Sequence, residues 1–163
     1  MEKIVLGLGS NVGNSMEYLR KAVKSLSQLV QNPQVSSVYK TKPQDYLAQA
    51  DFLNLVFVGD YQGSPKSLLA CTQKIERENG RNRFKEVAKG PRTLDIDILL
   101  FGEHIVNTQK LIIPHPAMKK RQFVLIPLLE ILPDYAEPIS NIPYSFFQKA
   151  LEEQGVEKLC SLW

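Results

Sequence analysis

Two aspartates, Asp95 and Asp97, lie two residues apart in an otherwise apolar and β-branched run that ends at Phe101. This pattern predicts a buried strand, in which residues i and i+2 point to the same face about 6.6–7 Å apart. Two carboxylates at the edge of a core repel each other unless a cation lies between them. The pair therefore predicts a site for one or two divalent metal ions. An exposed strand face, or pairing with lysine or arginine, is the alternative.

A basic segment leads directly into this aspartate pair. Its cationic residues are Arg81, Arg83, Lys85, Lys89 and Arg92. The planar fork of arginine suits phosphate oxygens, and carboxylate-held magnesium together with arginines neutralises a transferring phosphoryl group. A solvated surface loop is the alternative. The sequence has no P-loop motif, and the glycines at positions 7, 9 and 13 miss the dinucleotide fingerprint by one residue. We interpret Gly7 and Gly9 as the exit of a strand, so phosphate binding would depend on side chains.

Other polar residues could complete such a site, although each also has an ordinary structural explanation. Gln73 and Glu76 lie three residues apart on a predicted helix and could simply form its exposed surface. Asn54 lies inside an apolar run, where its amide could recognise a heteroaromatic ring or bond to a neighbouring strand. His115, between two prolines and near Arg121, could contact a phosphate or be a structural loop histidine.

The overall composition limits the classes of protein to which this chain can belong. The chain has 163 residues, 44% of them hydrophobic and 23% charged, which predicts one folded domain over residues 1–163. A formal net charge of +3 is too small for a general nucleic-acid or membrane binder. The two cysteines, Cys71 and Cys160, do not indicate a disulfide framework and favour a reducing cytoplasm. No coiled-coil pattern or long apolar edge calls for a partner, so we expect a cytoplasmic monomer that binds neither nucleic acid nor membrane.

Hydrophobic periodicity predicts the elements that must position these residues. We expect strands at 3–8, 35–41, 52–60 and 93–101, with a hairpin-like segment at 102–113. We expect a helix from Asn14 or Ser15 to about Leu29, ended by Pro33. We expect further helices from Ser64 to Asn79 and in two short C-terminal segments at 119–131 and 144–154. The order β-α-β-β-α-β predicts a ferredoxin-like α+β fold, an antiparallel sheet with both main helices on one face. The C-terminal helices would cover the other face.

The run from Gly90 to Leu99, Gly-Pro-Arg-Thr-Leu-Asp-Ile-Asp-Ile-Leu, resembles the signature of the 6-hydroxymethyl-7,8-dihydropterin pyrophosphokinases, enzymes of folate biosynthesis. Segments 8–11, 36–41, 52–54, 73–76, 80–83 and 114–116 are similar to that family in order and spacing. The resemblance implies a three-layer α-β-α sandwich around the ferredoxin-like core. It also implies transfer of pyrophosphate from ATP to the hydroxymethyl group of a reduced pterin, with release of AMP.

The resemblance further implies a role for individual residues. The catalytic set would be Arg81, Arg92, Asp95 and Asp97, the two aspartates holding two Mg²⁺ ions that bridge the ATP phosphates. ATP would contact Gln73, Glu76, Arg83, Arg92, Ile98, His115 and Arg121. The pterin would contact Thr41, Lys42, Gln44, Phe52, Asn54 and Phe123, with the two phenylalanines sandwiching its ring.

This sequence departs from the family pattern in the basic segment. A tryptophan common there is missing, and Ala88 and Lys89 stand in its place. An RNA-binding module is the alternative function, because ferredoxin-like domains with basic loops and strand aromatics can bind RNA. The modest net charge and the aspartate pair, which would repel a phosphate backbone, argue against that alternative.

Overall fold

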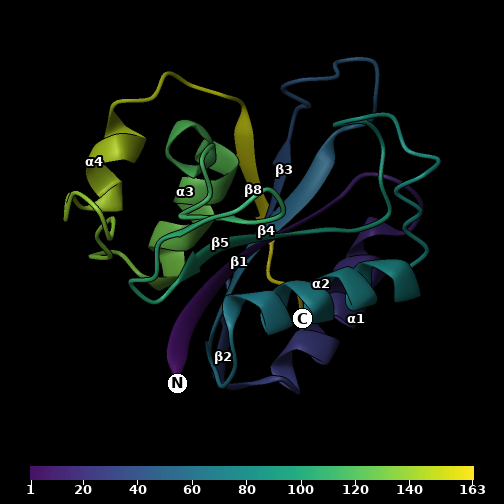
Figure 1. The fold of residues 1–163 in the computed structure, drawn as a ribbon. Helices are drawn as coiled ribbons and strands as arrows, with labels where there is room; N and C mark the ends of the chain where they lie inside the picture. Colours follow the sequence, from purple (N-terminus) through teal and green to yellow (C-terminus); the bar gives the residue numbers. More distant parts are fainter.

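A central antiparallel sheet separates two layers of helices in the computed structural model, which describes residues 1–163 (Figure 1). The first part of the chain forms β1 (Glu2–Ser10), α1 (Ser15–Ser27), β2 (Val30–Val35), β3 (Val38–Thr41), β4 (Phe52–Tyr61) and α2 (Pro65–Glu78). The second part forms β5 (Asp95–Phe101), β6 (Val106–Asn107), β7 (Ile112–Ile113), the 3-10 helix η1 (Met118–Lys120), α3 (Gln122–Ile131), α4 (Tyr144–Lys149) and β8 (Val156–Cys160). The main sheet has the order β5-β1-β4-β3-β8, and β2 also pairs with β4. The predicted ferredoxin-like core is confirmed.

The two faces of the sheet support two separate hydrophobic cores. Side chains alternate along a strand, so Ile4, Leu6 and Leu8 of β1 point to one face while Val5 points to the other. The first face packs against α1 and α2 in a cluster of 19 buried residues. The second packs against α3 and α4 in a cluster of 10 buried residues. The sandwich has three layers, with the C-terminal helices on the face opposite α1 and α2 (Figure 1).

The predicted starts of both main helices are confirmed by their caps. The Asn14 side chain accepts a hydrogen bond from the backbone N–H of Glu17 at 3.2 Å and so caps α1. Ser64 caps α2 by accepting from the backbone N–H of Ser67 at 3.1 Å, and Pro65 takes the first helical position. Gly80, with φ of +83°, follows the end of α2 in the left-handed conformation that glycine favours.

The segment from Ser27 to Thr41 differs from the expectation. The first helix ends at Ser27 rather than near Leu29, and the single strand expected at 35–41 is two strands, β2 and β3. Pro33 does not end the helix but lies inside β2. This position tolerates proline because the pairing of β2 with β4 is irregular between Gln31 and Gln34, so no regular ladder hydrogen bond is lost there.

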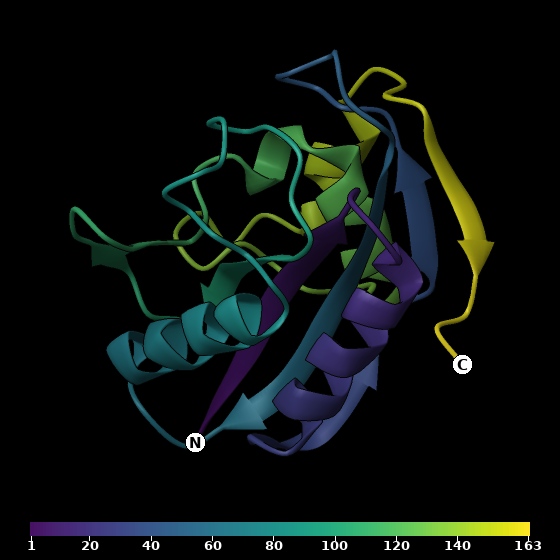
Figure 2. The ribbon, with the colours of Figure 1, turned by 90° about the vertical axis from the view of Figure 1, so that its right-hand side faces the viewer.

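The C-terminal segment also differs from the expectation. The last helix ends at Lys149 instead of continuing to 154, and β8 follows as a strand that the sequence pattern did not predict. Figure 2 shows β8 lying along the outer side of β3, with which it pairs at the edge of the sheet. Most residues of β8 are exposed, so the strand lacks the alternating pattern that marks a half-buried strand. No helix of the structure combines the length and apolarity needed to cross a membrane.

Candidate active site

The floor of the candidate site is formed by three neighbouring strands in register. Gly9 of β1 pairs with Asp95 of β5 on one side and with Asn54 of β4 on the other, and Gly7 pairs with Asp97. A Cβ at Gly9 would lie 2.7 Å from the Asn54 side-chain oxygen, so glycine keeps this floor open. Our interpretation of Gly7 and Gly9 as a strand exit was wrong, because both lie inside β1.

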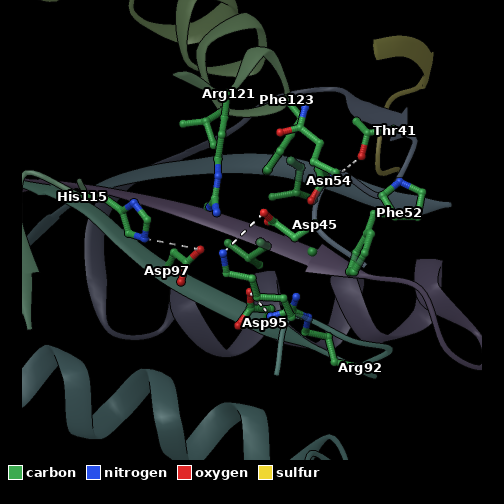
Figure 3. A pocket seen from close by; sticks show the side chains of 18 of the residues that line it. Thr41, Asp45, Phe52, Asn54, Arg92, Asp95, Asp97, His115, Arg121 and Phe123 are labelled. Atoms are coloured by element: carbon green, nitrogen blue, oxygen red, sulfur yellow. Dashed lines mark hydrogen bonds and ion pairs between the residues drawn. The ribbon is translucent and has the colours of Figure 1, made fainter. Parts of the chain in front are cut away.

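A recess above this floor brings together most of the predicted site residues (Figure 3). The predicted pterin contacts that line it are Thr41, Lys42, Gln44, Phe52, Asn54 and Phe123. The titratable residues that line it include Arg81, Arg83, Arg92, Asp95, Asp97, His115 and Arg121.

Three of the predicted ATP contacts lie outside the recess. Gln73 and Glu76 line a neighbouring hollow between α2 and the basic segment, which they share with Arg81 and Arg83. The Ile98 side chain is buried in the core on the α1 and α2 side of the sheet. The Ile98 side chain therefore cannot contact the nucleotide. A contact through the Ile98 backbone stays a prediction.

The two aspartates have different surroundings. Asp95 is ion-paired with Arg81 and with Arg92, whose Nη1 lies 3.1 Å from the Asp95 Oδ2. Asp97 has no arginine within ion-pair distance, and its nearest basic atom is the His115 Nε2 at 3.9 Å (Figure 3). Its side chain keeps 38% of its accessible surface, on the wall of the recess. The surrounding protein, followed by the neighbouring charge of Asp95, raises the pKa of Asp97 to about 7.

This pair of carboxylates has the chemistry of a magnesium site. No group of three or more His, Cys, Asp or Glu side chains forms a metal cage anywhere in the structure. Mg²⁺ does not need one, because it is commonly bound through one or two carboxylates together with substrate phosphates and water. No arginine lies within ion-pair distance of Asp97, and its neighbour Asp95 is a second carboxylate, so a divalent cation beside the pair would be favourable and the residues present fit the ion.

Glu76 orients two of the arginines from beneath the recess. Its side chain is 2% exposed, and its Oε1 accepts hydrogen bonds from Arg81 Nη1 at 2.8 Å and from the backbone N–H of Ile96 at 2.8 Å. Its Oε2 accepts from Arg83 Nη2 at 2.7 Å. Burial alone would lower the pKa of Arg81, but Asp95 and Glu76 raise it, so the guanidinium stays charged. Glu76 thus acts as a buried anchor for the basic segment.

Arginines also connect the acidic end of the recess to its aromatic residues. The Arg92 guanidinium carbon lies 5.4 Å from the centre of the Phe52 ring, and that of Arg121 lies 5.5 Å from the centre of the Phe123 ring. The Arg92 Nε is buried without a hydrogen-bond partner. A buried donor without a protein acceptor is unusual, and a phosphate oxygen of a ligand would satisfy it.

The opposite end of the recess suits a flat heteroaromatic ring. The Asn54 Nδ2 donates to the Thr41 hydroxyl at 2.7 Å, which fixes the amide, while no protein group donates to its Oδ1. Phe52 and Phe123 add aromatic faces to the lining. An amide acceptor between aromatic side chains provides both stacking and an oriented polar contact.

His115 presents a neutral donor to the recess. Its backbone N–H donates to the Leu99 carbonyl at 2.9 Å, and its Nδ1 accepts from the backbone N–H of Ala117 at 3.2 Å. The proton of the neutral ring is therefore on Nε2, which faces Asp97. Burial and the positive charge of Arg121 lower the pKa of His115, although Asp95 opposes them.

Sequence reasoning missed the residues that join the two loops beside the recess. Asn11 accepts a hydrogen bond from the Arg92 backbone N–H at 3.0 Å and donates to the Gln49 side chain at 2.9 Å. Gln49 in turn donates to the Lys89 carbonyl at 3.1 Å, and the Lys89 ammonium lies 3.4 Å from an Asp45 oxygen. Lys89 and Asp45 come from segments with no expected pairing, so only their proximity in the fold reveals this contact.

Comparison with known proteins places this chain in a family. The model of the 7,8-dihydro-6-hydroxymethylpterin-pyrophosphokinase family matches residues 5–133. The chain is 40% identical over 149 residues to the 2-amino-4-hydroxy-6-hydroxymethyldihydropteridine pyrophosphokinase of Aquifex aeolicus, covering 91% of both chains. It is 49% identical over 128 residues to the Bacillus subtilis enzyme of the same name, covering 77% of this chain and 75% of that enzyme.

Solved structures support the same fold. A crystal structure of Plasmodium falciparum HPPK-DHPS, wild type with SDX-DHP, superimposes with a TM-score of 0.72 at 16% identity. The match covers 91% of this chain and 44% of the longer solved chain. The chain belongs to the 7,8-dihydro-6-hydroxymethylpterin-pyrophosphokinase family.

Proposed function

We propose that the recess is the site at which this pyrophosphokinase binds ATP beside 6-hydroxymethyl-7,8-dihydropterin and transfers pyrophosphate to it, releasing AMP. One observation carries this assignment: Asp95, Gly9 and Asn54 are in register on adjacent strands. Two strand spacings, about 10 Å, therefore separate the acidic end from the pterin-like end. That separation leaves room for a phosphate chain between a nucleotide and a ring bound at Asn54.

The charged residues would bind and neutralise the phosphates. Two Mg²⁺ ions bound at Asp95 and Asp97 would supply further positive charge to the phosphate oxygens. Arg92 has a buried N–H without an acceptor, and Arg121 has no carboxylate partner, so both are free to donate to phosphate oxygens. Arg81 is already bound to Glu76 and Asp95, so it acts by holding Asp95 in place as well as by its charge.

The aromatic end would orient the pterin for attack. Stacking against Phe52 and Phe123 would fix the plane of the ring, and the Asn54 Oδ1 would accept a hydrogen bond from its polar edge. Thr41, Lys42 and Gln44 line the same end and would complete the contact. Holding the hydroxymethyl oxygen in line with the β-phosphorus would lower the activation barrier of the transfer, because the two reacting atoms are already oriented. Positioning and electrostatics would then supply most of the rate enhancement.

The nucleotide would extend toward α2. Gln73 and Glu76 border the hollow that shares Arg81 and Arg83 with the recess. We therefore keep these residues, with His115 and the Ile98 backbone, as proposed ATP contacts.

Identification of the nucleotide product tests the proposed function. The protein is incubated with ATP, Mg²⁺ and 6-hydroxymethyl-7,8-dihydropterin, and the nucleotides are separated by chromatography. AMP in equal amount to the pterin diphosphate is expected, with no AMP when EDTA removes the divalent ion. Formation of ADP would indicate ordinary phosphoryl transfer, and retention of ATP would exclude the proposed reaction.

We also propose that residues 1–163 act as a single domain and as a cytoplasmic monomer. Both cores are built on the same sheet, which supports a single domain. Sedimentation at concentrations used for activity should give the mass of one chain, 18.5 kDa. Activity that rises more than linearly with protein concentration would contradict a monomeric enzyme.

A further inference from the structure

Gln154, in the segment between α4 and β8, is the centre of a hydrogen-bond cluster beside the recess. Its Oε1 accepts from the Gln44 side chain at 2.9 Å and from the backbone N–H of Gln122 at 2.9 Å. Its Nε2 donates to the Lys120 carbonyl at 2.9 Å, and its backbone N–H donates to the Gln122 side chain at 2.8 Å. One side chain therefore joins three segments that are far apart in the sequence.

Backbone partners fix the orientation of the Gln154 amide. The Gln122 backbone nitrogen can only donate and the Lys120 carbonyl can only accept, so the Gln154 oxygen and nitrogen cannot exchange places. Because the Gln154 oxygen can only accept, the Gln44 amide must turn its nitrogen toward it and donate. The cluster thus has one hydrogen-bonding arrangement.

The cluster supplies a cap that α3 otherwise lacks. The first backbone N–H groups of a helix have no partner within the helix. Arg121, at the N-cap of α3, makes no capping hydrogen bond, because a guanidinium has no acceptor for a backbone N–H. Gln154 instead accepts from the first N–H of α3, at Gln122. The residues on either side of Gln122, Arg121 and Phe123, both line the recess.

The other arm of the cluster reaches the loop that leaves β3. Gln44 in this loop lines the recess at its pterin end. In Figure 2 the chain that precedes β8 passes beside this loop. Gln154 therefore ties the Gln44 loop, on one wall of the recess, to the start of α3, which carries Phe123 on another wall. The family match ends at residue 133, so this tie comes from a segment beyond it.

We propose that Gln154 is a positioning residue for pterin binding, which sets the separation between the Gln44 loop and Phe123. This inference rests on the proposed binding of the pterin at that end of the recess. Gln154 does not line the recess. It would affect the bound pterin only by positioning Gln44 and α3. At the ATP end, Asp95, Asp97 and Arg92 do not touch the cluster, and only Arg121, at the start of α3, lies beside it. Loss of Gln154 should therefore weaken pterin binding much more than ATP binding.

Two substitutions at this position test the proposal. Gln154→Ala removes all three hydrogen bonds of the side chain, to Gln44, Gln122 and Lys120, which predicts a pterin Kd and KM raised about 5- to 30-fold. The kcat at saturating pterin should change little, and the Kd for a non-hydrolysable ATP analogue should rise by a much smaller factor than the pterin Kd. Gln154→Glu keeps an oxygen acceptor for Gln44 and Gln122, but it turns its second oxygen toward the Lys120 carbonyl, where two acceptors repel each other. It should therefore restore part of the pterin affinity.

Gln62→Ala serves as the matched control, because Gln62 is exposed between β4 and α2 and its side chain makes no hydrogen bond. Pterin binding is measured by titration calorimetry and folding by thermal unfolding, on all variants. Wild-type pterin affinity in Gln154→Ala, or no recovery in Gln154→Glu, would overturn the proposal. Equal loss of ATP and pterin affinity with a lowered Tm would show a general scaffold role and would also overturn it. Failure of the proposed function would appear as a wild-type protein that does not bind the pterin. Failure of the Gln154 proposal would appear only in the variants, with the wild type binding the pterin normally.

Discussion

Asp95 and Asp97 face the same side of one strand but have unequal electrostatic surroundings. Asp95 is neutralised by Arg81 and Arg92, whereas Asp97 faces the recess without an arginine partner. The pKa of Asp97 is about 7, well above its ordinary value of 3.8, so the folded state holds the proton more tightly than the unfolded state. Between these two pH values, stability falls as pH rises, because ionised Asp97 is less favourable in the fold than in water. We infer that this carboxylate is retained for function rather than for stability.

We expect Asp97→Asn to lower kcat/KM by about 10²–10³-fold or more, because it removes a carboxylate that would hold Mg²⁺ beside the phosphates. In the absence of divalent ions at pH 8, the same variant should be at least as stable as the wild type. Stability is measured by urea denaturation with EDTA, and activity by AMP release. A variant that is both fully active and less stable would contradict the assigned role.

Arg92 bridges the two ends of the recess, since it is ion-paired with Asp95 and lies over Phe52. Arg92→Ala should lower the single-turnover rate about 10²–10³-fold, as loss of a transition-state donor does. Arg92→Lys keeps the charge but loses the planar fork, so it should recover only part of this loss. The Kd for the pterin is measured separately. Equal losses in rate and in pterin affinity would indicate that Arg92 mainly supports Phe52.

At the scale of elements, a single glutamate of α3 holds β3 beside the recess. The Glu130 carboxylate accepts hydrogen bonds from the Ser37 backbone N–H at 2.9 Å, from the Ser37 hydroxyl at 2.8 Å and from the Tyr39 hydroxyl. β3 ends at Thr41, which binds the Asn54 amide. Burial alone would raise the pKa of Glu130, but the hydrogen bonds from Tyr39 and Ser37 lower it. The ionised form of Glu130 is therefore favoured by folding.

Glu130→Gln should reduce the free energy of unfolding at pH 7 by about 1–3 kcal/mol, because hydrogen bonds to a charged acceptor are lost. The wild-type advantage is present above the ordinary pKa of 4.5 and is lost as pH falls through the lowered pKa. Urea denaturation at pH 7 and at successively lower pH should show the difference between the two proteins shrinking below pH 4.5. A difference that stays constant with pH would contradict the role of the ionised carboxylate.

At the scale of the whole molecule, the two cores share one sheet. Phe57 of β4 is fully buried on the face of α1 and α2, and Leu125 of α3 is fully buried on the other side. Because both cores pack against the same strands, neither can unfold without exposing the other. We therefore expect the molecule to unfold cooperatively.

Phe57→Ala should cost about 3–5 kcal/mol and Leu125→Ala about 2–5 kcal/mol of unfolding free energy, through lost burial and the cavities left behind. Each variant should show one transition by both far-ultraviolet circular dichroism and the near-ultraviolet circular dichroism of the buried tyrosines, among them Tyr61 and Tyr144. Non-coincident transitions in Leu125→Ala alone would indicate that α3 and α4 unfold as a separate unit.

Local sequence signals were sufficient for much of the fold. Asn14, Ser64 and Pro65 begin helices where their chemistry predicts, because a cap depends only on residues within one turn. The strand period alone placed Asp95 and Asp97 on one face. Pro33 and β8 were misjudged, because an irregular pairing and an exposed edge strand depend on a partner strand distant in the sequence.

By itself, the sequence determined the β-α-β-β-α-β core, the helix caps and the shared face of the two aspartates, since these depend on neighbours a few residues away. Only the tertiary structure decided which charges are compensated. It buried Glu76 beneath Arg81 and Arg83, left Asp97 without an arginine, and brought Gln154 between Gln44 and Gln122. Hydrogen bonds and ion pairs act over a few ångströms in space, and the residues that form these contacts are separated by up to 110 positions in the chain.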